Sequence, residues 1–280
     1  MAFERWPVAA IVQCCNAAKK RKPKAMTQKH TLTILMATTF FLGGCAMREP
    51  WTLAEGQHPQ SFEKQSGKTD KTRFLLYLPP GYDKVAGKTW PLIVFLHGSG
   101  ERGDDIEKVK LHGPPKIVET QRDFPFIVVS PQAPANTNWD STSLKVLLDE
   151  VIARLPVDVD RIYLTGLSRG GHGTWNMAAD HPERFAAIAP VCGASDVKRA
   201  CNLKNIPIWA FHGDKDTVVS LKDGADMVDA VKACGGDVKF TVYPGVGHDS
   251  WTQTYENPAL YEWFLQHKRQ TSASRKPFPA

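Results

Sequence analysis

The chain has 280 residues, of which 42% are hydrophobic and 23% charged; this composition excludes a largely disordered chain and is typical of a globular protein with a sizeable core. Residues 1 to 44 hold seven of the 35 Lys and Arg residues and one of the 29 Asp and Glu residues, which leaves 28 of each kind in the rest. Residues 45–280 therefore have a formal net charge of zero when histidine is counted as neutral. A nucleic-acid partner is excluded, because such a partner requires a clear excess of Lys and Arg.

Residues 1–44 are predicted to be a leader. The apolar run Leu32 to Leu42 is eleven residues long, which is too short for a membrane span of about 20 residues but suits a signal peptide. Small residues before Cys45 resemble a bacterial lipobox, which implies an acylated Cys45 and a lipid-anchored protein of the cell envelope, with its folded part outside the cytoplasm. A conventional cleaved signal and an uncleaved anchor remain alternatives. Met26 begins a more typical leader than Met1 does, so translation is expected to start there.

From residue 71 to residue 270, apolar β-prone runs alternate with segments of helical spacing. This alternation predicts one α/β domain with a mostly parallel sheet and helices on both faces, in three layers. Residues 45–70 are expected to be a linker leading into a first hairpin, and residues 271–280 a polar tail. The strands are expected at 73–78, 90–96, 126–130, 162–164, 186–190, 206–211 and 238–243, and the helices at 144–155, 170–179, 225–234 and 259–267.

The cysteines outside the leader are Cys45, Cys192, Cys201 and Cys234. In an oxidising compartment, Cys192 and Cys201 are candidates for a disulfide because they are nine residues apart in one loop region. Cys234 is then the odd thiol, expected to be buried on a helix. No two cysteines have the spacing with histidines that zinc ligands show, so no metal site is predicted.

The segment Gly166-Leu-Ser-Arg-Gly170 stands between an apolar strand and a helical pattern. Glycines on both sides of a serine allow a turn tight enough to lift its hydroxyl clear of the sheet, so Ser168 is a candidate nucleophile. An ordinary Gly-rich connection has the same pattern. A serine nucleophile also needs a base and an orienting carboxylate, and Asp216 and His248 each follow a predicted strand. Both are expected at the carboxyl edge of the sheet, where such folds carry their ligands.

Four segments, in this order, resemble the α/β-hydrolase superfamily: 96–103, 166–171, 212–216 and 247–251. The likeness is closest to the phospholipase/carboxylesterase and dienelactone-hydrolase branch, which includes predicted peptidases of prolyl-oligopeptidase type. It implies that Ser168 is the nucleophile, His248 the base and then the acid, and Asp216 the orienting acid. The backbone N–H groups of Ser99 and Arg169 would form the oxyanion hole. No cofactor or metal is implied. Many relatives carry methionine where this chain has Arg169, which changes the rim of the pocket.

Several other polar residues near these motifs are assigned local roles. Asp214 is a rival to Asp216 as the acid but is expected to be a turn residue, and Asp249 is not expected to bond its neighbour His248. Within the segment Glu101 to Asp104, an arginine–carboxylate tie that holds the oxyanion loop is expected, although this segment also suits a polar group of the substrate. The histidines expected to be structural are His97, His172 and His212.

Two tryptophans, Trp139 and Trp251, are placed either in the substrate pocket or under loops. The expected activity is hydrolysis of a carboxylic ester of a small molecule, carbohydrate or lipid through an acyl-enzyme. One alternative is a serine peptidase of prolyl-oligopeptidase type, although those relatives usually need a large N-terminal propeller that residues 45–70 cannot form. The other is a non-catalytic binding protein of the envelope with the same fold.

Overall fold

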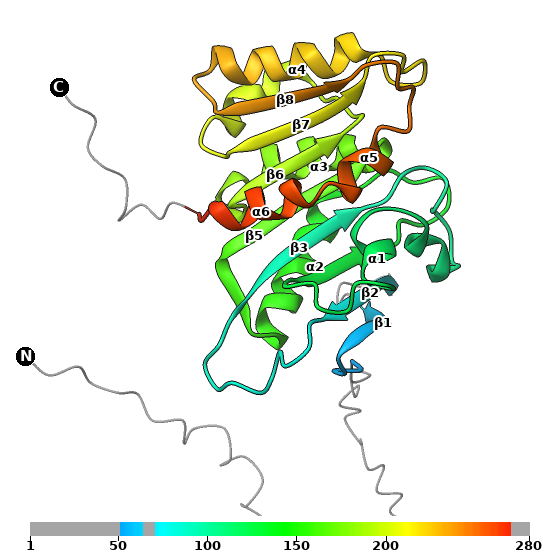
Figure 1. Cartoon of the computed structure of the whole chain (residues 1–280), viewed down its shortest axis with the longest axis vertical. Helices are drawn as coiled ribbons and strands as arrows, with labels where there is room; N and C mark the ends of the chain where they lie inside the picture. The colour runs from blue at the N-terminus through cyan, green and yellow to red at the C-terminus, as the bar shows by residue number, and fades with distance from the viewer. Residues whose placement is uncertain (1–50, 64–70, 270–280) are drawn as a thin grey trace, which may run out of the picture. The chain divides into compact units, whose positions relative to one another are not determined.

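A single sheet organises the part of the chain that the computed structural model describes, residues 51–63 and 71–269 (Figure 1). Its eight strands follow the order β1-β2-β4-β3-β5-β6-β7-β8. The pairs β1–β2 and β2–β4 are antiparallel, and all other pairs are parallel. The mostly parallel sheet predicted from the sequence is therefore confirmed. The strands are β1 (Gly56–Glu63), β2 (Lys71–Leu78), β3 (Trp90–Leu96), β4 (Ile127–Pro131), β5 (Val157–Leu167), β6 (Ala187–Val191), β7 (Ile208–Gly213) and β8 (Val238–Tyr243).

Helices cover both faces of this sheet, as predicted. Helices α2, α3 and α4 pack with one face of the strands in one hydrophobic cluster, and α5 and α6 pack with the other face in a second cluster. The short helix α1 contacts α5. The α-helices are α1 (Gly113–Ile117), α2 (Ser141–Arg154), α3 (Arg169–Asp180), α4 (Leu221–Ala233), α5 (Trp251–Glu256) and α6 (Pro258–Gln266), and the 3₁₀ helices are η2 (Ile106–Leu111), η3 (Pro182–Arg184) and η4 (Val197–Leu203).

Strand β3 shows why the apolar runs form buried parallel strands. Leu92, Val94 and Leu96 belong to the cluster on one face, and the intervening Ile93 and Phe95 belong to the cluster on the other. Side chains alternate along a strand, so a run that is apolar at every position supplies two cores at once. The three-layer arrangement follows from this pattern.

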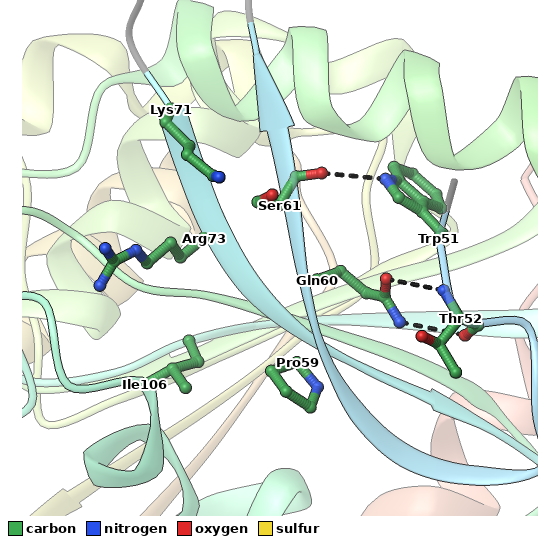
Figure 2. A pocket seen from close by; sticks show the side chains of 8 residues that line it. All are labelled: Trp51, Thr52, Pro59, Gln60, Ser61, Lys71, Arg73 and Ile106. Carbon is green, nitrogen blue, oxygen red and sulfur yellow. Dashed lines mark hydrogen bonds between the residues drawn. The ribbon is translucent and has the colours of Figure 1, made fainter. Parts of the chain in front are cut away.

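The expected linker at residues 45–70 is wrong over part of its length. Residues 56–63 form β1, which pairs along its whole length with β2. The preceding segment is tied to β1 by hydrogen bonds from Trp51 Nε1 to the Ser61 carbonyl (3.1 Å) and between Gln60 and the backbone of Thr52 (3.0 Å each way), as Figure 2 shows. Residues 51–63 are therefore part of the folded domain.

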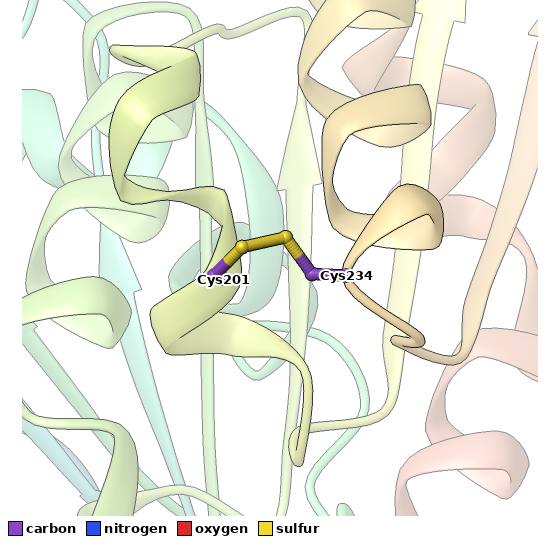
Figure 3. The surroundings of a disulfide bond; sticks show 2 residues. All are labelled: Cys201 and Cys234. Carbon is purple, nitrogen blue, oxygen red and sulfur yellow. A yellow bond between two sulfur atoms is a disulfide. The ribbon is translucent and has the colours of Figure 1, made fainter.

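The cysteine pairing also differs from the expectation. Cys201, in η4, forms a disulfide with Cys234, which directly follows α4 (Figure 3). Cys192 is the free cysteine among the described residues, and it is buried. Cys201 and Cys234 meet because η4 and α4 pack against each other although they are distant in sequence. The nine-residue spacing between Cys192 and Cys201 could not reveal this contact.

The leader at 1–44, Cys45 and the tail at 271–280 lie outside the described residues, so the predictions made for them stay predictions. Within 51–63 and 71–269, the helices are all too short or too polar for a membrane span.

Candidate active site

Ser168 occupies the turn between β5 and α3. Its backbone has φ 52° and ψ −115°, a left-handed conformation that an L-residue adopts only under constraint. The Ser168 N–H donates to the Val191 carbonyl at 2.9 Å, which ties the turn to the end of β6. A strained serine between a strand and a helix is the arrangement called a nucleophile elbow.

The glycines on either side of Ser168 are required by close approach of the backbone. A Cβ on Gly166 would lie 2.5 Å from the Gly170 carbonyl oxygen, and one on Gly170 would lie 1.8 Å from that of Leu96. Both contacts are with main chain, which cannot move aside as a flexible side chain can. The elbow therefore depends on these two glycines for its position against β3.

Three predicted side chains meet at the carboxyl edge of the sheet. The Nε2 atom of His248 lies 2.8 Å from Ser168 Oγ, and its Nδ1 atom lies 2.8 Å from Asp216 Oδ2. Because an ionised carboxylate only accepts hydrogen bonds, Nδ1 carries the proton and Nε2 is free to accept from the serine hydroxyl. The geometry is that of a serine, a base and an orienting acid connected in series.

The Asp216 carboxylate is held in its charged form. Burial raises the pKa of Asp216, but hydrogen bonds from His248 and from the N–H groups of Val219 and Val218 outweigh it, so that the pKa lies below its ordinary value. Those two N–H groups donate to Oδ1 at 3.0 and 2.9 Å. The ionised carboxylate keeps the His248 imidazole in the orientation and tautomer described above.

His212 lies closer to the acid than the sequence indicated. It was expected to be a locally satisfied histidine, and its Nε2 does donate to the Val219 carbonyl at 2.9 Å. The same atom is 3.3 Å from Asp216 Oδ2, so that two imidazoles face one carboxylate oxygen. Asp214, by contrast, accepts from the Gly245 N–H at 2.7 Å and occupies the turn position expected for it.

The two residues predicted for the oxyanion hole lie next to each other. Arg169 is the first residue of α3, so its backbone N–H is among those that have no acceptor within the helix. Its side-chain Nε donates to Ser99 Oγ at 2.9 Å, which brings the loop after β3 against the start of α3. The positive end of α3 adds to the attraction for negative charge that develops here.

The expected tie between an arginine and a carboxylate in the oxyanion loop is not found. Arg102 donates instead to two main-chain carbonyls, that of Ser99 at 3.0 Å and that of Thr137 at 3.3 Å. Glu101 is buried, with its oxygens 3.8 Å from His97 Nδ1 and from His112 Nε2. The loop is thus held by carbonyl acceptors, which sequence spacing does not reveal.

His97 has the structural role expected of it. Its Nδ1 donates to the Gly98 carbonyl at 2.7 Å, and its Nε2 accepts from the Ala133 N–H at 3.0 Å. Burial lowers the pKa of His97 to about 4, although the bond to Gly98 acts in the opposite direction. His97 therefore stays neutral at physiological pH and connects the loops that follow β3 and β4.

The depressed pKa of His97 predicts acid sensitivity. In the unfolded chain this histidine takes up a proton near its ordinary pKa of about 6.5, whereas in the folded protein it does so only near pH 4. The free energy of unfolding is therefore expected to fall by up to about 3 kcal/mol as the pH drops through this window. Urea titrations of wild type and His97→Gln at pH 7.5 and 4.5 check this, because the variant should lose less stability than wild type between the two pH values. Equal losses would contradict the buried neutral histidine.

The two tryptophans have different surroundings. Trp139 packs on His97 with ring centroids 4.7 Å apart, and a Cβ on Gly173 would meet its ring at 2.7 Å, so it lies between the loop after β3 and helix α3. Trp251 stands 5.3 Å from the His248 ring and 5.5 Å from the His112 ring. It lines a hollow of about 240 Å³ between α1 and α5. Of the two, Trp251 is the one beside the candidate site.

Cys192 is a neighbour that sequence reasoning missed. Its Sγ accepts from the Ser168 N–H at 3.3 Å, and burial raises the pKa of its thiol to about 12. Ligand atoms of Cys192, Asp216 and His248 all lie within 4.8 Å of one another, a spacing from which the three can hold a metal ion. A metal there would compete with Ser168 and Asp216 for the His248 nitrogens. The sequence did contain a signal for this neighbour: Cys192 directly follows β6, and β6 pairs with the strand that leads to Ser168.

The strand order, the elbow at Ser168 and the loops after β7 and β8 define an α/β-hydrolase fold. A family model described as phospholipase/carboxylesterase matches residues 123–259. The chain is 26% identical over 238 residues to a probable feruloyl esterase C of Aspergillus niger, covering 80% of this chain and 82% of that protein. It is also 26% identical to a poly(3-hydroxyoctanoate) depolymerase of Pseudomonas fluorescens, covering 66% and 81%.

Among solved structures, a thermostable esterase superposes with a TM-score of 0.67 at 31% identity, and the match covers 76% of this chain and 63% of that one. A ferulic acid esterase superposes with a TM-score of 0.53 at 20% identity, covering 74% and 96%, and supports the fold alone. The chain has an α/β-hydrolase fold, and its similarity to these esterases indicates a carboxylesterase-like hydrolase.

Proposed function

We propose that this chain cleaves carboxylic esters through an acyl-enzyme, with Ser168 as nucleophile, His248 as base and then acid, and Asp216 as the orienting acid. The observation that carries the proposal is the unbroken series of two hydrogen bonds, each 2.8 Å, from Ser168 Oγ through the His248 ring to Asp216. Similarity to proteins named as esterases supports the same reaction class.

In the first half of the reaction, His248 Nε2 removes the Ser168 proton as Oγ bonds to the ester carbonyl carbon. The N–H groups of Ser99 and Arg169 stabilise the oxyanion that forms. The bond to the alcohol then breaks, and the imidazolium gives its proton to the departing oxygen. In the second half, water loses a proton to His248, attacks the acyl carbon and releases the acid, and Ser168 recovers its proton.

The natural ester is proposed only by class. Relatives named as feruloyl esterase, poly(3-hydroxyoctanoate) depolymerase and acyl-protein thioesterase support a carboxylic ester or a thioester as the substrate class. Structural neighbours named as peptidases are 15% and 17% identical and support the fold alone. Hydrolysis of short and long acyl esters, feruloylated sugars and a prolyl amide, measured side by side, separates these substrate classes.

Labelling with a fluorophosphonate tests the reaction itself. Wild type is expected to gain one phosphonyl group on Ser168, because only an activated serine displaces fluoride, and to lose ester hydrolysis in proportion. Ser168→Ala should remain unlabelled. Intact-protein mass spectrometry and peptide mapping give the readout. A wild-type protein that folds but takes up no label would favour a non-catalytic binding protein instead.

We also propose that the protein is exported and anchored to the bacterial envelope through a lipid on Cys45. The Cys201–Cys234 disulfide supports export, since such bonds persist in oxidising compartments. Globomycin blocks lipoprotein processing, so treated cells are expected to accumulate an unprocessed precursor. A mature form without lipid would overturn the anchor and leave export standing.

A further inference from the structure

Two arginines converge on Ser99 beside the nucleophile. Arg169 donates through Nε to Ser99 Oγ at 2.9 Å and through Nη1 to Asn138 Oδ1. Arg102 donates to the Ser99 carbonyl at 3.0 Å and to the Thr137 carbonyl at 3.3 Å. Each guanidinium thus joins the oxyanion loop to the loop before α2, and all of its protein acceptors are neutral oxygens.

In the described part of the chain, the positive charges of Arg102 and Arg169 have no direct carboxylate partner. Within 51–63 and 71–269, neither Arg102 nor Arg169 has a carboxylate at ion-pair distance, whereas Arg154, Arg184, Arg199 and Arg269 each do. In the same part of the chain, the Nη2 groups of Arg102 and Arg169 have no hydrogen-bond acceptor. Both residues are half-buried, and the hydrogen bonds that hold their guanidinium groups lie at the exposed edge of the site.

The guanidinium groups of Arg102 and Arg169 lie close to the position where the substrate would bind. Arg169 directly follows Ser168, and its side chain lies on Ser99, whose N–H is proposed for the oxyanion hole. The positive end of the twelve-residue helix α3 points to the same place. The Nη2 group of Arg169 can donate a charge-assisted hydrogen bond to a carboxylate oxygen. Because its side chain is already fixed by two bonds, little conformational entropy is lost when it binds.

We propose that Arg169, with Arg102 adding to the local positive potential, binds a carboxylate carried by the ester substrate, so that the enzyme selects anionic esters over neutral ones of the same shape. This inference rests on the proposed function and deepens it by assigning a substrate class.

Matched pairs of esters test the proposal. On the alcohol side, 4-acetoxybenzoate is compared with the neutral 4-acetoxybenzamide. On the acyl side, the 4-nitrophenyl half-ester of adipate is compared with the corresponding amide, after subtraction of spontaneous hydrolysis. Wild type is expected to favour the carboxylate member of at least one pair in kcat/KM. In Arg169→Met that preference should fall by about 10-fold or more, mainly through KM, since a charge-assisted bond is lost. Arg169→Lys should retain only part of it.

The ratio within a pair is the readout, because Arg169 also supplies an N–H to the proposed oxyanion hole and its replacement changes both rates. Arg122→Met is the control; it removes one positive charge from an exposed site and should leave the ratio unchanged. An equal ratio in wild type and Arg169→Met for both pairs would overturn the carboxylate subsite. Failure of the proposed function looks different, since wild type would then hydrolyse neither member and take up no fluorophosphonate.

Discussion

Replacing His248 with alanine is expected to lower kcat for ester hydrolysis by about 10⁶-fold, the scale observed when the base of a serine triad is removed. The side chain stands between Ser168 Oγ and Asp216 Oδ2 at 2.8 Å from each, so its loss leaves the serine without a base and the carboxylate without its donor. Burst and steady-state kinetics with a 4-nitrophenyl ester measure the change.

The control for this variant is His58→Ala. His58 lies on β1, where its ring contacts the Glu55 carbonyl, and its replacement is expected to change kcat by less than about 2-fold, as for surface positions away from a site. If His248→Ala keeps more than a hundredth of the wild-type kcat, His248 is not the base, and a neighbour such as His212 would need to be tested next.

Replacing Gly170 with alanine is expected to lower the free energy of unfolding by more than about 4 kcal/mol. The added Cβ would stand 1.8 Å from the Leu96 carbonyl oxygen and 2.5 Å from its carbon, so that α3 must move away from β3. Movement of α3 displaces the strained turn at Ser168, and activity should fall together with stability. Urea denaturation followed by circular dichroism gives the stability.

Gly100→Ala is the matched control, because nothing lies within 4 Å of a Cβ there and the backbone is not in the left-handed region. It is expected to change the free energy of unfolding by no more than about 0.5 kcal/mol. A Gly170→Ala protein as stable as Gly100→Ala would mean that α3 and β3 are not in contact as described.

The sequence predicted best what depends on local pattern. Runs such as 90–96 and 238–243 are strands at the predicted bounds, because an uninterrupted apolar or alternating run leaves a buried strand few other conformations. Gly166 and Gly170 allowed the turn at Ser168 to be predicted, because a side chain at either position would clash with the main chain. Asp216 and His248 were found by their place after strands, since parallel strands bring their carboxyl ends to one edge.

Features that depend on packing between distant segments were predicted less well. Strand β1 is polar at several positions, and its strand character comes from pairing with β2 rather than from its own sequence. Cys201 pairs with Cys234 because η4 lies against α4, and spacing alone favoured Cys192. The acceptors of Arg102 are main-chain carbonyls, and these could not be predicted because every residue carries one.

The Cys201–Cys234 bond has a consequence for the way the site is assembled. Between these two positions the chain includes β7, the loop with Asp216 and α4, whereas Ser168 and His248 lie outside that interval. Asp216 therefore lies within a loop that the disulfide closes, whereas Ser168 and His248 lie on segments outside that loop. Reduction of this one bond would therefore open the loop that carries the carboxylate and leave the segments with the nucleophile and the base unchanged in connectivity.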